Sequence, residues 1–318
     1  DETAIEERNT GHGMNGVGLS MDPVFVKLTS SPVFMHPSFA GSADKSRLTA
    51  AYRNQMPSFP GNLVTYYLSF DTYISALHSG VAIISYYNDA LQGMVNSWYN
   101  GFVISPKIRI RENISVEPAI QLGYLAMRVD EGKLSELNNT DPNYGYTYDA
   151  SMNSSGSLNN SHLLDLSGGL LLQWSKFYGG FSIEHITQAM KDPTDAAFIP
   201  RRYSVQGGVS LKRYRNSDFT CSPNIQFDMQ YKTTTLLWSS AFSYKSLIWG
   251  VGFGNQDRFV VMLGLQKNKF RFGYNFDSQL AKLGSNAASA HELSLRYYFS
   301  KKDQNGSGKT DDVVTLLR

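Results

Sequence analysis

The sequence has one cysteine, little charge and no long apolar run. Cys221 has no second cysteine to pair with, so no internal disulfide framework supports the fold. Only 18% of the 318 residues are charged, and 29 basic side chains are balanced by 27 acidic ones. A net charge of +2 argues against a nucleic-acid binder driven by bulk charge. No stretch of about 18 continuous apolar residues occurs, which excludes membrane-spanning helices.

Aromatic residues and glycine are abundant instead. The chain has 19 Tyr, 18 Phe and 4 Trp, together 13% of its residues, and 27 Gly, yet its mean hydropathy is −0.29. A chain with many aromatics, little charge and no apolar block has to distribute its apolar side chains by alternation. This composition is typical of an all-β protein, and in particular of a transmembrane antiparallel outer-membrane β-barrel.

Period-two alternation is clearest over residues 269–277. The even positions are aromatic and the odd positions are polar or glycine: Phe270, Phe272, Tyr274 and Phe276 against Arg271, Gly273, Asn275 and Asp277. Such a strand has one apolar and one polar face. A similar pattern over residues 291–299 ends at Phe299, an aromatic on the apolar face that resembles the barrel-end signal of bacterial outer-membrane proteins.

Alternating runs of this kind number fourteen, and we predict a barrel of about 14 strands. They cover residues 46–55, 62–73, 79–88, 94–110, 114–130, 161–174, 177–186, 202–214, 218–231, 233–244, 246–255, 258–267, 269–278 and 290–299. An even count is what a closed single-chain bacterial barrel normally requires, with twelve or sixteen strands as alternatives. A soluble β-sandwich is less suitable, because soluble strands average about 5–6 residues and these runs are about ten long.

The connections between runs alternate between short and long. Short connections follow the even-numbered runs, at 111–113, 175–176, 215–217, 245 and 268, and long ones follow odd-numbered runs, at 131–160, 187–201 and 279–289. Bacterial barrels have short periplasmic turns and longer outside loops. We therefore expect both chain termini to lie in the periplasm.

Two segments flank the predicted barrel at residues 46–299. Within residues 1–45, the part from 24 to 41 is apolar and interrupted by prolines. Proline does not fit a strand of a closed sheet, so we expect this segment either to fold into the barrel as a plug or to pack against a periplasmic partner. Residues 300–318 are polar and contain Gly and Ser, and we expect a flexible periplasmic tail.

Charged residues near the end of the chain are predicted to face the lumen. Four of them lie on two neighbouring strands: Arg271, Asp277, Glu292 and Arg296. The simpler interpretation is a solvated or ion-paired interior. The alternative is a gated path or a polar seat for a plug.

No sequence pattern predicts a catalytic, metal or cofactor site. The six histidines lack metal-ligand spacing, and no Gly-x-Ser-x-Gly motif occurs. Glu184 and His185 are adjacent, so on a strand they would face opposite sides and not act together. A Ser/His hydrolase site built from separate strands would leave no spacing signal and stays an alternative. We predict that the protein is not an enzyme and uses no cofactor.

An ordered set of short motifs resembles one known family. Its residues are, in chain order, Pro37, Phe39, Ala40 and Gly41, then Arg53, Asn54 and Gln55, then Phe70 and Asp71, then Asn88 and Asp89, and finally the segment 291–299. Over residues 31–299 this set resembles the PorP/SprF family of the type IX secretion system of Bacteroidota. Two positions depart from the family pattern: His36 stands where Asn is usual, and Met56 where Trp often occurs.

The resemblance implies an outer-membrane barrel needed for secretion or cell-surface anchoring of proteins with type IX C-terminal domains. It implies membrane lipid as a partner, together with other secretion subunits, among them a periplasmic ring lipoprotein and its partner. It also implies a secreted C-terminal-domain protein or a large gliding adhesin as cargo. Membership of the core machine and dedication to one adhesin both stay open. A passive outer-membrane porin is the alternative function.

Overall fold

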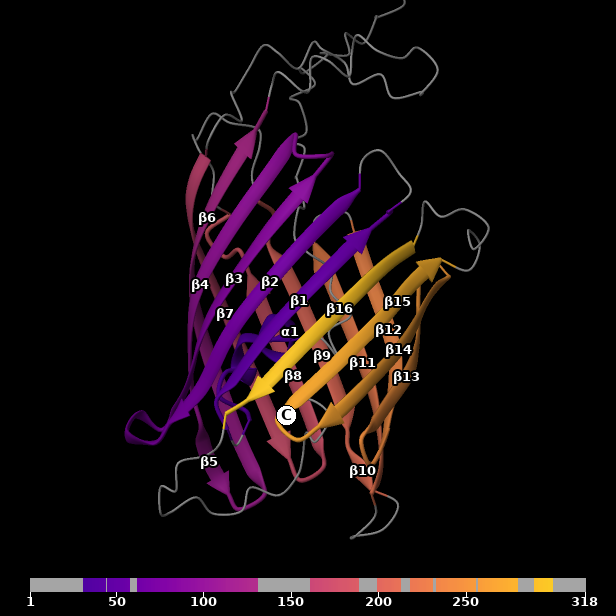
Figure 1. Cartoon of the computed structure of the whole chain (residues 1–318). Coiled ribbons are helices and arrows are strands. Elements are labelled where there is room, and N and C mark those ends of the chain that lie inside the picture. The colour runs from indigo at the N-terminus through magenta and orange to yellow at the C-terminus, as the bar shows by residue number, and fades with distance from the viewer. Residues whose placement is uncertain are drawn as a thin grey trace, which may run out of the picture.

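The computed structural model describes residues 31–43, 45–57, 62–130, 161–188, 199–212, 218–230, 233–255, 257–279 and 289–299. Of the two flanking segments expected from the sequence, residues 1–30 and 300–318 lie outside this part of the chain. The described strands form one antiparallel sheet that closes into a barrel (Figure 1). None of the helices among these residues is long and apolar enough to cross a membrane.

The barrel wall has fourteen strand positions. Two of the sixteen strands are short and extend a preceding strand after a break: β5 (Ile108–Arg111) extends β4, and β10 (Leu211–Lys212) extends β9. The others are β1 (Arg47–Gln55), β2 (Leu63–Ile74), β3 (Ser79–Ala90), β4 (Val95–Pro106), β6 (Ile114–Val129), β7 (Ser161–Trp174), β8 (Phe177–Glu184), β9 (Arg202–Val209), β11 (Phe219–Gln230), β12 (Thr233–Tyr244), β13 (Leu247–Gly254), β14 (Arg258–Lys267), β15 (Phe270–Gln279) and β16 (Ser289–Tyr298). The predicted barrel of fourteen strands is confirmed.

Strand β1 closes the sheet by pairing on both sides. Arg47 lies opposite Asp71 of β2 and opposite Tyr298 of β16, and the register continues to Gln55 on both partners. Every wall strand is thereby hydrogen-bonded on two sides, which a hydrocarbon environment requires of backbone N–H and C=O groups.

The alternation read from the sequence separates a membrane face from a lumen face. On β15, the side chains of Phe270 and Phe272 are 43% and 52% exposed, whereas Arg271 is 3% and Asn275 0% exposed. Aromatic and aliphatic side chains cover the outside of the barrel, and polar side chains fill its inside, as expected for a barrel surrounded by lipid.

Tight turns mark one end of the barrel, here called the short-turn end. They lie at 75–78, 112–113, 175–176, 245–246 and 268–269. Ser175, Lys245 and Asn268 have φ values of 52°, 53° and 55°, which two-residue hairpins favour because the left-handed turn matches the twist of the strands. The opposite end is called the long-loop end.

Candidate functional site

Residues 31–43, here called the plug, lie inside the barrel (Figure 1). They form α1 (Pro32–Met35) and the 3₁₀ helix η1 (Pro37–Phe39). Each helix begins with proline, whose missing N–H is not needed at that position. The prolines that exclude this segment from the sheet therefore favour two short helical turns, and Phe39 at their end is 0% exposed.

Hydrogen bonds attach the plug to the inner wall at four places. The Ser31 hydroxyl donates to Tyr67 of β2 at 2.9 Å, and Lys107, which follows β4, donates to the carbonyl of Ser38 at 2.7 Å. The other two attachments come from His36 and Gly41. Because the anchor points are spread over several strands, the plug is fixed in one position relative to the wall.

His36 connects the plug to β8. Its Nδ1 accepts the backbone N–H of Ser38 at 3.2 Å, so the ring proton lies on Nε2, which is 3.0 Å from the carbonyl of Phe181. The ring also lies against the glycines of the wall: a Cβ at Gly169 would approach His36 Cε1 to 2.7 Å. The glycine in β7 therefore makes room for the imidazole.

Gly41 and Gly80 allow the backbone of the plug to touch the wall. Gly41 has a φ of +64°, a conformation that favours glycine. A Cβ added at Gly80 of β3 would lie 1.8 Å from the carbonyl oxygen of Ala40. Both positions therefore require glycine, one for its conformation and both for close packing.

Aromatic side chains form the apolar part of the contact. The Phe34 ring meets Tyr67 and Tyr86 edge-on at centroid distances of 5.4 Å and 6.2 Å. Phe39 meets Tyr178 at 5.9 Å. Edge-to-face pairs contribute about 0.5–1.5 kcal/mol each beyond their buried area, so these contacts add to the polar anchors.

A buried ion pair ties the plug to the first two strands. Arg47 Nε and Nη2 donate to the two carboxylate oxygens of Asp71 at 2.8 Å and 2.9 Å. Asp71 Oδ2 also accepts the backbone N–H of Gly41 at 3.0 Å. Both charged side chains are essentially inaccessible to solvent, so one carboxylate serves the wall and the plug together.

A second ion-pair network lies on the wall between β1 and β14–β16. Arg53 donates to Asp277 at 2.9 Å and to Glu292 at 3.2 Å. Asp277 also accepts two hydrogen bonds from Arg258, at 2.7 Å and 3.0 Å, and Asn275 donates to Glu292 at 2.9 Å. Two acidic side chains from neighbouring strands are thus neutralised by arginines from β1 and β14.

The four lumen charges chosen from the sequence divide into two groups. Asp277 and Glu292 belong to this network, whereas Arg271 and Arg296 lie opposite each other nearer the short-turn end. Arg258 was not among the lumen charges predicted from the sequence. It lies two residues before inward-facing Val260 in β14, and this spacing would have predicted that Arg258 faces the lumen.

The motif residues also divide, by the direction in which they point. Asp71 and Arg53 take part in the two ion-pair systems, and Asn88 bridges Thr65 and Ser97 at 2.8 Å and 3.1 Å. Phe70 faces outward and meets the ring of Phe299 at 6.0 Å. The remaining motif side chains of these strands are half-buried, namely Asn54, Gln55 and Asp89, and the plug motif residues Pro37, Phe39, Ala40 and Gly41 are buried.

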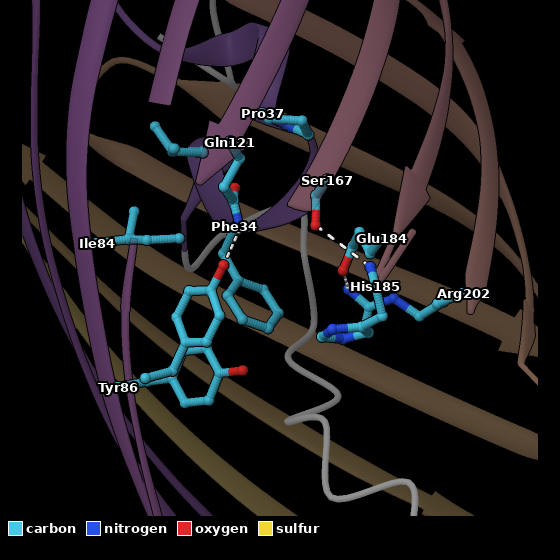
Figure 2. Close-up of a pocket in the computed structure, with 11 residues that line it drawn as sticks. Phe34, Pro37, Ile84, Tyr86, Gln121, Ser167, Glu184, His185 and Arg202 are labelled. Carbon is cyan, nitrogen blue, oxygen red and sulfur yellow. Dashed lines mark hydrogen bonds and ion pairs between the residues drawn. The ribbon is translucent and has the colours of Figure 1, made fainter. Parts of the chain in front are cut away.

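A pocket lies between the plug and the inner face of the wall (Figure 2). Val33, Phe34 and Pro37 of the plug form one side, and side chains from β3, β4 and β6–β9 form the rest. The wall residues are Ile84, Tyr86, Tyr99, Gln121, Ser167, Glu184, His185 and Arg202. Gln121 donates to the Tyr99 hydroxyl at 2.7 Å, and Glu184 pairs with Arg202.

The sequence-based expectation for Glu184 and His185 was wrong, since both line this pocket. Strand β8 ends at Glu184, and His185 has a φ of 56°, so the alternation of a strand no longer separates them. The His185 ring faces Asp165 at 3.1 Å. Ser167 accepts the backbone N–H of His185 at 3.3 Å rather than meeting its ring, so this contact does not have the geometry of a Ser/His nucleophile pair.

Comparisons with known proteins give one family match. A family model described as "Type IX secretion system membrane protein PorP/SprF" matches residues 18–297, which include the plug and nearly all of the barrel. No curated protein sequence gave a significant match.

Several solved structures are similar in fold. They include the CymD monoaromatic hydrocarbon channel, with 11% identity, 90% of this chain and 97% of that chain covered and a TM-score of 0.46. The Pseudomonas putida toluene transporter TodX has 10% identity, 85% and 92% coverage and a TM-score of 0.45. The KdgM porin has 12% identity, 79% and 99% coverage and a TM-score of 0.34.

Proposed function

The chain belongs to the PorP/SprF family of type IX secretion system membrane proteins, and from that premise we propose that it is a non-enzymatic docking component of the outer membrane. It acts in the secretion or cell-surface anchoring of proteins with type IX C-terminal domains, as part of the core machine or with one large gliding adhesin. It receives or retains its cargo and does not conduct it.

The plug carries this proposal. Strands β2 and β8 and Lys107, which follows β4, hold residues 31–43 against the inner wall through hydrogen bonds and a buried aromatic contact. Porins of 16–18 strands already leave only an aqueous channel for small solutes. A fourteen-strand barrel with a fixed internal segment is therefore too narrow for a folded domain, and binding at its ends is the function that the geometry favours.

The motif residues have a structural role in this proposal. Phe39, Ala40, Gly41 and Asp71 keep the plug in place, while Arg53 and its two acidic partners stiffen the wall. The chain divides at about residues 45 and 299 into plug segment, barrel and tail. The short-turn end faces the periplasm with both termini, because bacterial barrels have short turns on that side. There it meets other secretion subunits, among them the ring lipoprotein and its partner.

A deletion strain tests the secretion role. We expect proteins with type IX C-terminal domains to be lost from the cell surface and to accumulate in the periplasm, and to return to the surface when the full-length gene is restored. Normal surface display in the deletion strain would contradict the proposal. Co-purification from native membranes then separates the two roles, since ring subunits indicate the core machine and an adhesin a dedicated one.

Single-channel conductance tests the porin alternative. The purified protein in a planar bilayer is expected to conduct little, and a variant that lacks residues 32–41 is expected to conduct more. A steady porin-sized conductance of the unmodified protein would favour the passive channel instead.

A further inference from the structure

Exposed charges at the short-turn end are mostly positive. Among the described residues, seven exposed basic ones lie there against two acidic ones: Lys45, Arg109, Arg111, Lys176, Lys245, Lys267 and Lys269 against Glu112 and Asp218. At the long-loop end, the exposed charges of the described residues are Arg128, Arg201 and Asp257. Among the described residues, the excess of exposed positive charge is therefore concentrated at the short-turn end.

Four of the basic residues lie next to lumen-facing residues of the wall and are here called the mouth set: Lys45, Arg109, Lys176 and Lys269. Three of them lie in the turn or bend just before a wall strand, and Arg109 lies on β5. Lys45 precedes inward-facing Arg47 by two residues, as Lys269 precedes Arg271 and Lys176 precedes Tyr178. Arg109 lies opposite Ser115, whose hydroxyl contacts inward-facing Glu117 at 3.3 Å.

The other three basic residues lie toward the membrane side. Lys267 follows outward-facing Leu265 by two residues, and the Lys245 ammonium lies 5.4 Å from the centre of the outward-facing Tyr244 ring. Arg111 lies opposite Ile114, on the face opposite to that of Arg109 because a bulge intervenes. These three are called the outer set, and they are placed to meet lipid headgroups.

A further row of arginines lies in the wall just inside the mouth set. Arg47, Arg271 and Arg296 are each at most 3% exposed, and Arg271 is directly opposite Arg296. Like charges at directly opposed positions of a sheet are unfavourable. Asp71 neutralises Arg47, whereas Arg271 and Arg296 lie beside the mouth set as two further positive charges, so this side of the opening is positive.

We infer that the mouth at the short-turn end is a docking site for an acidic polypeptide segment of a soluble protein. Charge complementarity selects an acidic partner and speeds its encounter. Lipid headgroups are the less suitable partner, because the mouth set lies next to lumen-facing residues of the wall, whereas headgroups surround its outer side. The inference rests on the proposed function in one respect only: the proposed function places the short-turn end, and therefore this partner, in the periplasm.

Peptide binding to the full-length protein in phosphatidylcholine nanodiscs tests the inference. The probe is a fluorescein-labelled peptide of alternating Glu and Ser, its uncharged match replaces Glu by Gln, and binding is followed by fluorescence anisotropy. We expect only the acidic peptide to bind, with an affinity that falls as salt rises. The variant K45Q/R109Q/K176Q/K269Q should bind at least about tenfold more weakly.

Two control variants test whether weaker peptide binding comes from the mouth set or from any loss of positive charge. R111Q/K245Q/K267Q neutralises the outer set, and R128Q/R201Q removes exposed charge at the long-loop end; both should change binding by less than about twofold. Heat-modifiable mobility on gels shows that each variant is a folded barrel. Equal losses in all variants, or no loss in the mouth variant, would overturn the inference.

Nanodiscs that contain phosphatidylglycerol distinguish a lipid from a protein partner. Peptide binding should persist there, because lipid neutralises only the outer set. Loss of peptide binding in these nanodiscs would show that lipid headgroups occupy the mouth set as well. The docking site and the secretion role also fail separately. Peptide binding to the mouth set together with normal cargo display in a deletion strain would contradict only the proposed function. Absence of peptide binding together with loss of cargo display would contradict only the docking site.

Discussion

The carboxylate of Asp71 accepts the backbone N–H of Gly41 at 3.0 Å and thereby joins the barrel wall to the plug. The same carboxylate forms a two-point ion pair with Arg47. The two interactions have different roles, because the ion pair lies within the wall and the backbone contact crosses from the wall to the lumen. Substitutions can therefore separate barrel stability from plug position.

Asp71→Leu is expected to destabilise the barrel. It leaves the Arg47 guanidinium buried without its carboxylate, and breaking such a pair costs about 3–5 kcal/mol. The free energy of unfolding, measured by urea titration in detergent micelles, should fall accordingly.

The double variant Arg47→Leu/Asp71→Leu serves as the control for this prediction. It removes both charges, and replacing a buried pair by apolar side chains is often close to neutral. Stability should recover, while the Gly41 amide still lacks its acceptor, so ion conductance through the barrel should be higher than in the unmodified protein. Equal destabilisation in the single and double variants would show that the pair itself does not matter.

Gly80→Ala is expected to displace the plug without unfolding the barrel. The added Cβ would lie 1.8 Å from the Ala40 carbonyl oxygen, a contact that can be relieved only by moving backbone. Single-channel conductance should therefore rise relative to the unmodified protein.

Gly179→Ala is the matched control for the Gly80 variant. A Cβ at Gly179 meets no atom closer than 4.0 Å, so this substitution should leave conductance unchanged. If both variants conduct like the unmodified protein, the contact between Gly80 and the plug does not hold the plug in place.

Sequence patterns predicted the barrel well because each membrane strand has to alternate. Phe270, Arg271 and Phe272 could be assigned to faces from their order alone, and the closed sheet follows the fourteen predicted runs. The pocket could not be predicted in this way. His185 enters it only because the chain turns into a left-handed conformation after Glu184, and no period-two pattern carries that information.

The partners of buried charges were also beyond sequence reasoning. Arg53 lies more than 200 residues before Asp277 and Glu292, and only the closure of β1 onto β16 brings them together. The resemblance selected Arg53 as a motif residue, and the alternation placed Asp277 and Glu292 in the lumen. Neither observation indicated that these residues contact each other.

The Arg53–Glu292 pair is expected to show strong energetic coupling. Arg53→Met removes the positively charged donor of the buried Glu292 carboxylate, to which Asn275 also donates, and the cost should be about 3–5 kcal/mol. Glu292→Gln alone leaves Arg53 paired with Asp277, so its cost should be smaller.

A double-mutant cycle with these two substitutions measures the coupling from urea unfolding. Residues in one ion-pair network typically couple by about 0.5–3 kcal/mol. Additive effects of the two substitutions would indicate that Arg53 acts through Asp277 alone.

His36→Asn tests how far this chain depends on its departure from the family pattern. Asn in place of His can still accept the Ser38 N–H as a helix cap, but its shorter side chain does not reach the Phe181 carbonyl. We expect a loss of about 1 kcal/mol for the missing hydrogen bond, with the plug retained.

His36→Ala removes the cap as well and should cost about 0.5–2 kcal/mol more. Protection of the plug against proteolysis, compared among the three proteins, measures the order. Equal protection in the Ala and Asn variants would show that the cap contributes nothing and that the Phe181 contact alone fixes this side of the plug.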